Sequence, residues 1–195
     1  MGSMLKQIWL VLVLSLIFAV ALAFVDQGTA QRIAENRQQQ VQALAQMAIL
    51  GEPAVGADGQ MQFKIKLEPV AIQDVQAAFR VTPAEGGDET LGYAVVVEGI
   101  GWDRMLILVG LSPDLQRITG VQIVESRETP GLGERIGDEA WRDQFRKPTA
   151  QPLELVKGRA QSPYQVEALT GATISSDAVT SLVNEATAKA LAQLK

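Results

Sequence analysis

The stretch TGATISS, residues 170–176, holds four hydroxyl side chains around Gly171 and Ala172, directly before a segment patterned as a helix. Backbone N–H groups at a helix start bind anions, and small residues let a phosphate approach that backbone closely. Ser, Thr and Asp are also the residues that cap helices. The stretch therefore predicts either a phosphate site that offers a hydroxyl or only a heavily capped helix start. Neither the Walker pattern nor GxGxxG is present.

A second stretch, ETPGLG at residues 128–133, is expected to form a tight loop because Pro and Gly are the commonest turn residues. Glu125, Glu128 and Glu134 could supply paired carboxylates for acid–base chemistry. A solvated connecting loop explains the same three residues. Local chemistry leaves both interpretations open.

Composition excludes several kinds of site. The 195 residues include no Cys and no His, which removes the usual ligands of zinc, haem and iron–sulfur clusters as well as Cys nucleophiles and His-dependent triads. We expect no metal site and no catalytic residue, so an organic cofactor would have to carry any redox chemistry. Trp102 and Trp141 could stack on such a planar ligand or simply fill the core or its rim. The net charge of -5 without a basic block argues against nucleic acid.

The element expected to position the hydroxyl stretch is a C-terminal helix. Its apolar face is formed by Val179, Leu182, Val183, Ala186, Ala190 and Leu191. Ser175, Ser176 and Asp177 compete for the N-cap, which predicts a helix over 175–194 with Thr173 at or just before its positive end.

An antiparallel meander is expected upstream of the loop, with strands over 91–98, 105–111 and 118–125, and residues 61–67 alternate like a further strand. Asp138 can cap a short helix that carries Trp141 and Phe145 on one face, and 153–156 and 164–169 are extended. The strands do not alternate with long helices. The fold class is therefore α+β, a compact domain with an antiparallel sheet and flanking helices.

The N-terminal part is apolar. Residues 8–25, IWLVLVLSLIFAVALAFV, are long enough to span a membrane as one helix, and a cleaved signal peptide is the alternative; both predict export of the remaining chain. Residues 1–3 are interpreted as a cloning remnant before Met4. Residues 26–50 are predicted to form a helical connector, and 51–195 an extracytoplasmic domain.

The two loop stretches together resemble the signatures of a known family. TGAT followed by ISS is similar to the [S/T]GA[T/S]-x-[S/T] flavinylation motif of the FMN-binding domain family, and ETPGLG, about forty residues upstream, resembles its other signature. The similarity extends over residues 92–195. Within the family it points to the G subunits of Rnf electron-transport complexes, with the C subunits of the sodium-translocating NADH:quinone reductase as a related group. Thr170 stands where the family usually has Ser, and Ser126 and Arg127 stand where it often has His.

The resemblance implies a covalent FMN joined through its phosphate to the Thr173 hydroxyl. It implies attachment by a flavin transferase, a domain on the periplasmic side of the inner (plasma) membrane, and a lipid bilayer and other membrane and redox subunits as partners. The chain would carry electrons in an ion-translocating complex without turning over a substrate of its own. The residues implied to form the cofactor site are Thr170, Gly171, Ala172, Thr173, Ser175 and Ser176, with Glu128, Thr129, Pro130, Gly131, Leu132 and Gly133.

Three alternatives remain at this point. The chain could be a C subunit of the quinone reductase, a stand-alone extracytoplasmic flavoprotein, or a non-redox, membrane-anchored assembly module in which TGAT only caps a helix. The last of these predicts a colourless protein.

Overall fold

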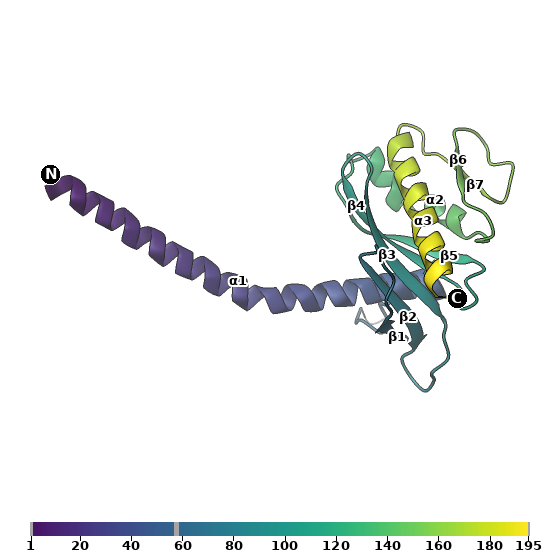
Figure 1. Ribbon diagram of the computed structural model, residues 1–195, viewed down its shortest axis with the longest axis horizontal. Helices are drawn as coiled ribbons and strands as arrows, with labels where there is room; N and C mark the ends of the chain where they lie inside the picture. The colour runs from purple at the N-terminus through teal and green to yellow at the C-terminus, as the bar shows by residue number, and fades with distance from the viewer. Residues whose placement is uncertain (1, 57–58, 195) are drawn as a thin grey trace. The chain divides into compact units, whose positions relative to one another are not determined.

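The computed structural model describes residues 2–56 and 59–194, and the chain divides into two compact units at Gln39/Gln40. A single helix, α1, runs over Gly2–Leu50 without a break between the predicted anchor and the predicted connector (Figure 1). Among the described residues it is the one helix long and apolar enough to cross a membrane, with a mean hydropathy of 2.2 in its apolar window. A signal sequence near the N-terminus would meet the same criteria of length and hydropathy, so the anchor stays a prediction.

A five-stranded antiparallel sheet forms the centre of the second unit, in the order β1-β2-β3-β4-β5. This confirms the predicted meander and the α+β class. The strands are β1 (Ile65–Pro69), β2 (Ala77–Pro83), β3 (Gly92–Ile100), β4 (Arg104–Leu111) and β5 (Ile118–Ser126).

The sequence did not indicate β2, and it placed the start of β1 at residue 61 instead of Ile65. Alanine is a poor strand former, and β2 begins with Ala77 and Ala78. Its backbone pairs with β1 on one side and with β3 on the other. These long-range pairings make the segment a strand.

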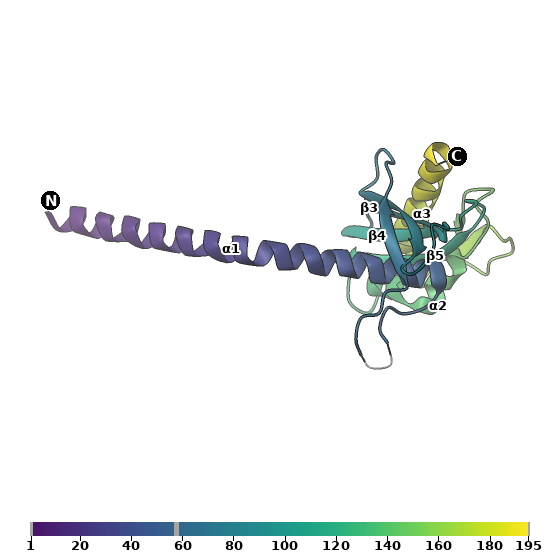
Figure 2. The same cartoon turned by 90° about the horizontal axis from the view of Figure 1, so that it is seen from below.

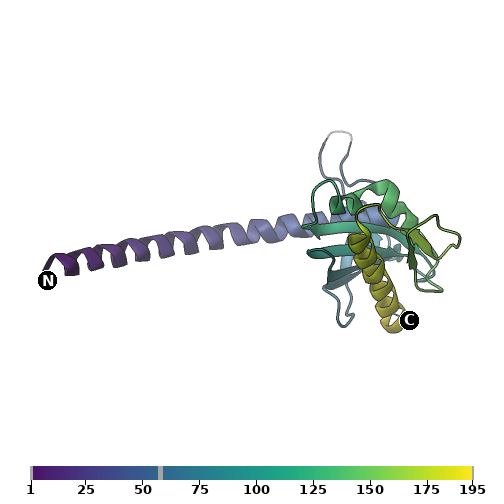
Figure 3. The ribbon, with the colours of Figure 1, turned by 90° about the horizontal axis from the view of Figure 1, so that it is seen from above.

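Both faces of the sheet are covered by helix. Val95 and Val97 of β3 face the core beneath the C-terminal helix α3 (Thr173–Gln193), whereas Ala94 and Val96 face the end of α1. The alternation follows the two-residue period of a strand. Figures 2 and 3, seen from opposite sides, show the end of α1 and α3 on opposite faces of the sheet.

The last turns of α1 pack against the sheet where two glycines pair across β4 and β5. Gly110 lies opposite Gly120, and a Cβ at Gly120 would stand 2.8 Å from the carbonyl oxygen of Ala48. Gln46, in the same turns of α1, is fully buried; its Nε2 donates to the Pro53 carbonyl over 3.2 Å and its Oε1 accepts the Lys64 N–H over 2.8 Å. Residues 40–50 are thus part of the folded domain.

Short elements connect β5 to α3. They are η1 (Gly133–Gly137), α2 (Glu139–Arg142), η2 (Asp143–Phe145) and the parallel pair β6 (Glu154–Val156) and β7 (Gln165–Glu167). Asp138 does precede α2, but its side chain makes no capping bond. Trp141 packs edge-to-face on Phe145 with ring centroids 5.1 Å apart, and its Nε1 donates to the Glu167 carbonyl over 2.8 Å. Trp141 is therefore a core residue and not a ligand-stacking one.

Candidate functional site

The start of α3 differs from the prediction. The helix begins at Thr173, with Ala172 at the N-cap position and no side-chain capping bond, so Ser175, Ser176 and Asp177 lie within the helix. The prediction that one of these three residues caps the helix is wrong. Ser176 Oγ donates to the Ala172 carbonyl over 2.9 Å and accepts the Leu169 N–H over 3.1 Å, which ties the preceding loop to the first turn.

The earlier start places Thr173 at the first position of the helix. The N–H groups of a first turn have no intrahelical acceptors, and they carry the positive end of the helix dipole. Gly171, just before the helix, has a φ of 85°, a conformation that glycine adopts without strain. The backbone reaches the helix start through this left-handed residue.

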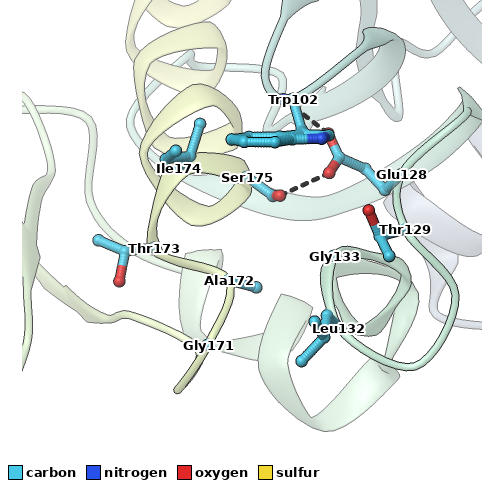
Figure 4. Close-up of a pocket in the computed structure, with 10 residues that line it drawn as sticks. All are labelled: Trp102, Glu128, Thr129, Leu132, Gly133, Gly171, Ala172, Thr173, Ile174 and Ser175. Carbon is cyan, nitrogen blue, oxygen red and sulfur yellow. Dashed lines mark hydrogen bonds between the residues drawn. The ribbon is translucent and has the colours of Figure 1, made fainter.

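A pocket of about 430 Å³ brings the two predicted stretches together (Figure 4). Its walls come from the β3–β4 turn, the loop after β5 and the start of α3. The lining residues are Trp102, Glu128, Thr129, Leu132, Gly133, Gly171, Ala172, Thr173, Ile174 and Ser175.

Four residues implied by the resemblance do not line this pocket. Thr170, Pro130 and Gly131 are exposed, and Ser176 is fully buried below the helix start. Ser176 holds the loop and helix together through its two hydrogen bonds. Ile174, which the sequence did not single out, lines the pocket and is 53% exposed, because the earlier helix start turns it outward.

Glu128 is buried in the wall of the pocket, with 8% of its surface exposed. Its Oε2 accepts a hydrogen bond from Ser175 Oγ at 2.6 Å, and its Oε1 accepts the backbone N–H of Trp102 at 3.1 Å. The solvated-loop interpretation therefore fails for Glu128, while Glu125 and Glu134 are exposed as that interpretation expects. Both oxygens are satisfied, as a buried carboxylate requires.

Gly133 leaves room for this carboxylate because it has no side chain. A Cβ at Gly133 would overlap Glu128 Oε2 and lie 3.0 Å from Ser175 Oγ. Any larger residue would have to displace the Glu128 carboxylate from its place beside Ser175. This is the physical requirement for glycine at the end of the ETPGLG stretch.

Trp102 stands at the mouth of the pocket, 69% exposed, in the turn between β3 and β4. In Figure 4 its ring lies over Ser175 and Glu128, with Leu132 across the pocket from it. Leu132 is 50% exposed. Of the two tryptophans that could meet a planar ligand, only Trp102 is at this site.

The four hydroxyls of the first stretch occupy different environments. Those of Ser175 and Ser176 are buried and hydrogen-bonded, and Thr170 lies outside the pocket lining. Thr173 lines the pocket, is half-buried, and makes no side-chain hydrogen bond within the described part of the chain. It is the one hydroxyl of the four that is both at the pocket and unengaged.

Comparison with known proteins identifies the family of this chain. The FMN-binding domain model matches residues 101–188, a range that contains all ten residues of the pocket. The G subunit of the proton-translocating ferredoxin:NAD(+) oxidoreductase complex of Clostridium ljungdahlii is 33% identical over 139 residues, 68% of this chain and 74% of that protein. This chain belongs to the FMN-binding domain family.

Two further comparisons extend the similarity beyond this domain match. The G subunit of the Na(+)-translocating ferredoxin:NAD(+) oxidoreductase complex of Acetobacterium woodii is 33% identical over 178 residues, 88% of this chain and 84% of that protein. The crystal structure of the C subunit of the Na(+)-translocating NADH-quinone reductase from Parabacteroides distasonis has the same fold, with a TM-score of 0.58 over 84% of this chain and 94% of that one at 15% identity.

The pocket of this FMN-binding domain fits its cofactor class. The exposed side chains of Trp102, Leu132 and Ile174 offer an apolar surface for a planar aromatic ring. The first turn of α3 offers unpaired N–H groups for a phosphate beside Thr173. The two ends of an FMN molecule would thus both meet matching chemistry in this pocket.

Proposed function

We propose that this FMN-binding domain is the electron-transfer subunit, of the G type, of a membrane-bound Rnf complex that couples electron transfer to ion translocation. The observation that carries the proposal is the convergence of residues 128–133 and 171–175 on one pocket. Two relatives, each 33% identical, are named as the G subunits of ferredoxin:NAD(+) complexes that translocate protons or Na⁺, and the alignments span 74% and 84% of their lengths.

We propose further that FMN is linked by a phosphoester to the Thr173 hydroxyl. The unengaged hydroxyl of Thr173 and its place at the pocket support this residue over Thr170, Ser175 and Ser176. A phosphodiester keeps one negative charge, which the dipole of α3 would stabilise by about 0.3–1 kcal/mol. The same first turn supplies the N–H donors.

No hydrogen bond joins the Thr173 hydroxyl to a base among the residues that line the pocket. Among the ten lining residues Glu128 alone is ionisable, and its oxygens already accept hydrogen bonds from Ser175 and Trp102. A threonine hydroxyl is a weak nucleophile without such a base. This supports attachment by a separate flavin transferase.

Bound FMN would supply one- and two-electron redox chemistry. The chain would hold the phosphate at the start of α3 and the ring against Trp102 and Leu132, while the mouth of the pocket stays open to a redox partner. We therefore expect electron exchange with other subunits of the complex, with α1 as the membrane anchor and the domain on the extracytoplasmic side.

Intact mass spectrometry of the full-length protein, produced together with a flavin transferase, tests the cofactor assignment. Wild type should gain the mass of FMN less one water and fluoresce after denaturing electrophoresis. Thr173→Val should gain nothing, and the matched variant Thr173→Ser, which keeps a hydroxyl, should be labelled. Release of all flavin from unfolded wild type would contradict the covalent link, and a colourless wild type would favour a non-redox assembly module.

A further inference from the structure

The pocket proposed to hold FMN has a buried carboxylate, that of Glu128, in its wall. Glu128 is 8% exposed, and its side chain is the only ionisable one among the residues described as lining the pocket. Burying a charge is costly unless it is hydrogen-bonded, and each oxygen of Glu128 accepts one hydrogen bond, at 2.6 Å and 3.1 Å.

The two hydrogen bonds of Glu128 connect three separate segments. Oε1 holds the β3–β4 turn through the Trp102 N–H, and Oε2 holds the first turn of α3 through Ser175 Oγ. Two glycines enclose the carboxylate: a Cβ at Gly101 would stand 2.8 Å from Oε1, and one at Gly133 would overlap Oε2. The charge is therefore fixed in place, and Figure 4 shows it beneath the Trp102 ring.

We propose that Glu128 is the residue that sets the reduction potential of the bound flavin, while its hydrogen bonds position Trp102 against the ring. This rests on the proposed function, because it requires FMN in this pocket. Two-electron reduction of the isoalloxazine with uptake of one proton adds one negative charge to the ring. A fixed negative charge in a low-dielectric wall disfavours that product and lowers the potential.

The test is a spectroelectrochemical titration of the full-length, flavinylated protein in detergent. Glu128→Gln removes the charge but keeps the contacts, since the amide can accept the Trp102 N–H and donate to Ser175 Oγ. At a fixed electrode potential the ratio of reduced to oxidised flavin should rise at least tenfold, which is about 30 mV for two electrons.

Glu134→Gln is the matched control, because Glu134 is an exposed carboxylate beside the same loop and its charge is screened by solvent. The inference is overturned if Glu128→Gln shifts the ratio no more than Glu134→Gln does. Wild type that takes up no flavin would instead overturn the proposed function, and this inference with it.

The positioning role of Glu128 is tested in protein that carries no flavin. In the unflavinylated protein, Glu128→Ala strands the Trp102 N–H and the Ser175 hydroxyl, so its melting temperature should fall, whereas Glu128→Gln should melt close to wild type. Equal melting of wild type and Glu128→Ala would overturn the positioning role.

Discussion

At the residue scale, side chains of one type have different roles because their surroundings differ. Ser175 supports the Glu128 carboxylate, and Ser176 fastens the loop before α3. Thr173, within the same short stretch, keeps its hydroxyl unengaged at the pocket. The division of roles depends on burial and on hydrogen-bond partners, neither of which is a property of the residue type.

Ser176→Ala should separate folding from flavin attachment. The substitution leaves the buried Leu169 N–H without its acceptor, which costs about 1–3 kcal/mol of unfolding free energy. Urea unfolding measures the loss. The protein that does fold should still carry FMN on Thr173, and complete loss of label in well-folded Ser176→Ala would assign this serine to the cofactor site.

At the element scale, the pocket depends on strands and helices that hold its three walls at fixed distances. The β3–β4 turn supplies Trp102, the loop after β5 supplies Glu128, and α3 supplies Ser175. Each wall is anchored in the core on one face of the sheet. The opposite face is closed by the end of α1, so packing there supports the site indirectly.

Gly120→Ala should weaken this second face. The new Cβ would stand 2.8 Å from the Ala48 carbonyl oxygen and 3.0 Å from Ala48 Cα, an overpacking that costs about 1–3 kcal/mol. Gly158→Ala is the control, because a Cβ there meets nothing within 4 Å. Chemical denaturation of the full-length protein compares the two, and equal midpoints would show that α1 does not pack there.

The β1–β2 edge should make folding stability depend on pH. Glu68 lies opposite Arg80 in the sheet, and the hydrogen bond from Arg80 at 2.6 Å, aided by its charge, lowers the pKa of Glu68 below its usual value of 4.5. A lowered folded-state pKa favours the ionised form, so its stabilisation is present above pH 4.5 and is lost as the pH falls through the lowered pKa.

Glu68→Gln should therefore lower the melting temperature slightly at neutral pH and should not lower it at a pH below that pKa. Glu89→Gln is the control, since Glu89 is exposed and makes no ion pair within the described residues. Thermal melts across pH measure both. The same difference from wild type at every pH would contradict the linkage.

At the scale of the whole molecule, the folded domain and the apolar N-terminal segment share one helix, α1. The compact unit begins at Gln40, whereas the predicted domain begins at residue 51. Ala45 and Ala48, in the stretch between these two starts, are fully buried against the sheet. The domain therefore needs the last turns of α1 to cover its second apolar face.

Two truncations test this boundary. A chain that begins at Gln40 should be monomeric and fold cooperatively. A chain that begins at Gly51 would expose Ile65, Val96 and Leu108, all buried here, and should aggregate. Size-exclusion chromatography with circular dichroism distinguishes the two chains, and a well-folded monomer starting at Gly51 would restore the predicted boundary.

The sequence by itself determined what local pattern and composition can encode. Alternating apolar runs predicted β3, β4 and β5, a long apolar run predicted the helix at the N-terminus, and the absence of Cys and His pointed to an organic cofactor. The spacing of residues 128–133 and 170–173, with the family resemblance, indicated the two stretches that meet at the pocket.

Only the tertiary structure decided the features that depend on long-range contacts. β2 is a strand because β1 and β3 both pair with it. The hydroxyls of Ser175 and Ser176 bind Glu128 and the Leu169 N–H and do not cap α3, which starts earlier than predicted. Glu128 is buried, and Trp102 stands over it, because the β3–β4 turn folds onto a loop distant in the sequence. Burial and hydrogen-bond partners arise only when distant segments pack, so residue type and spacing could not reveal them.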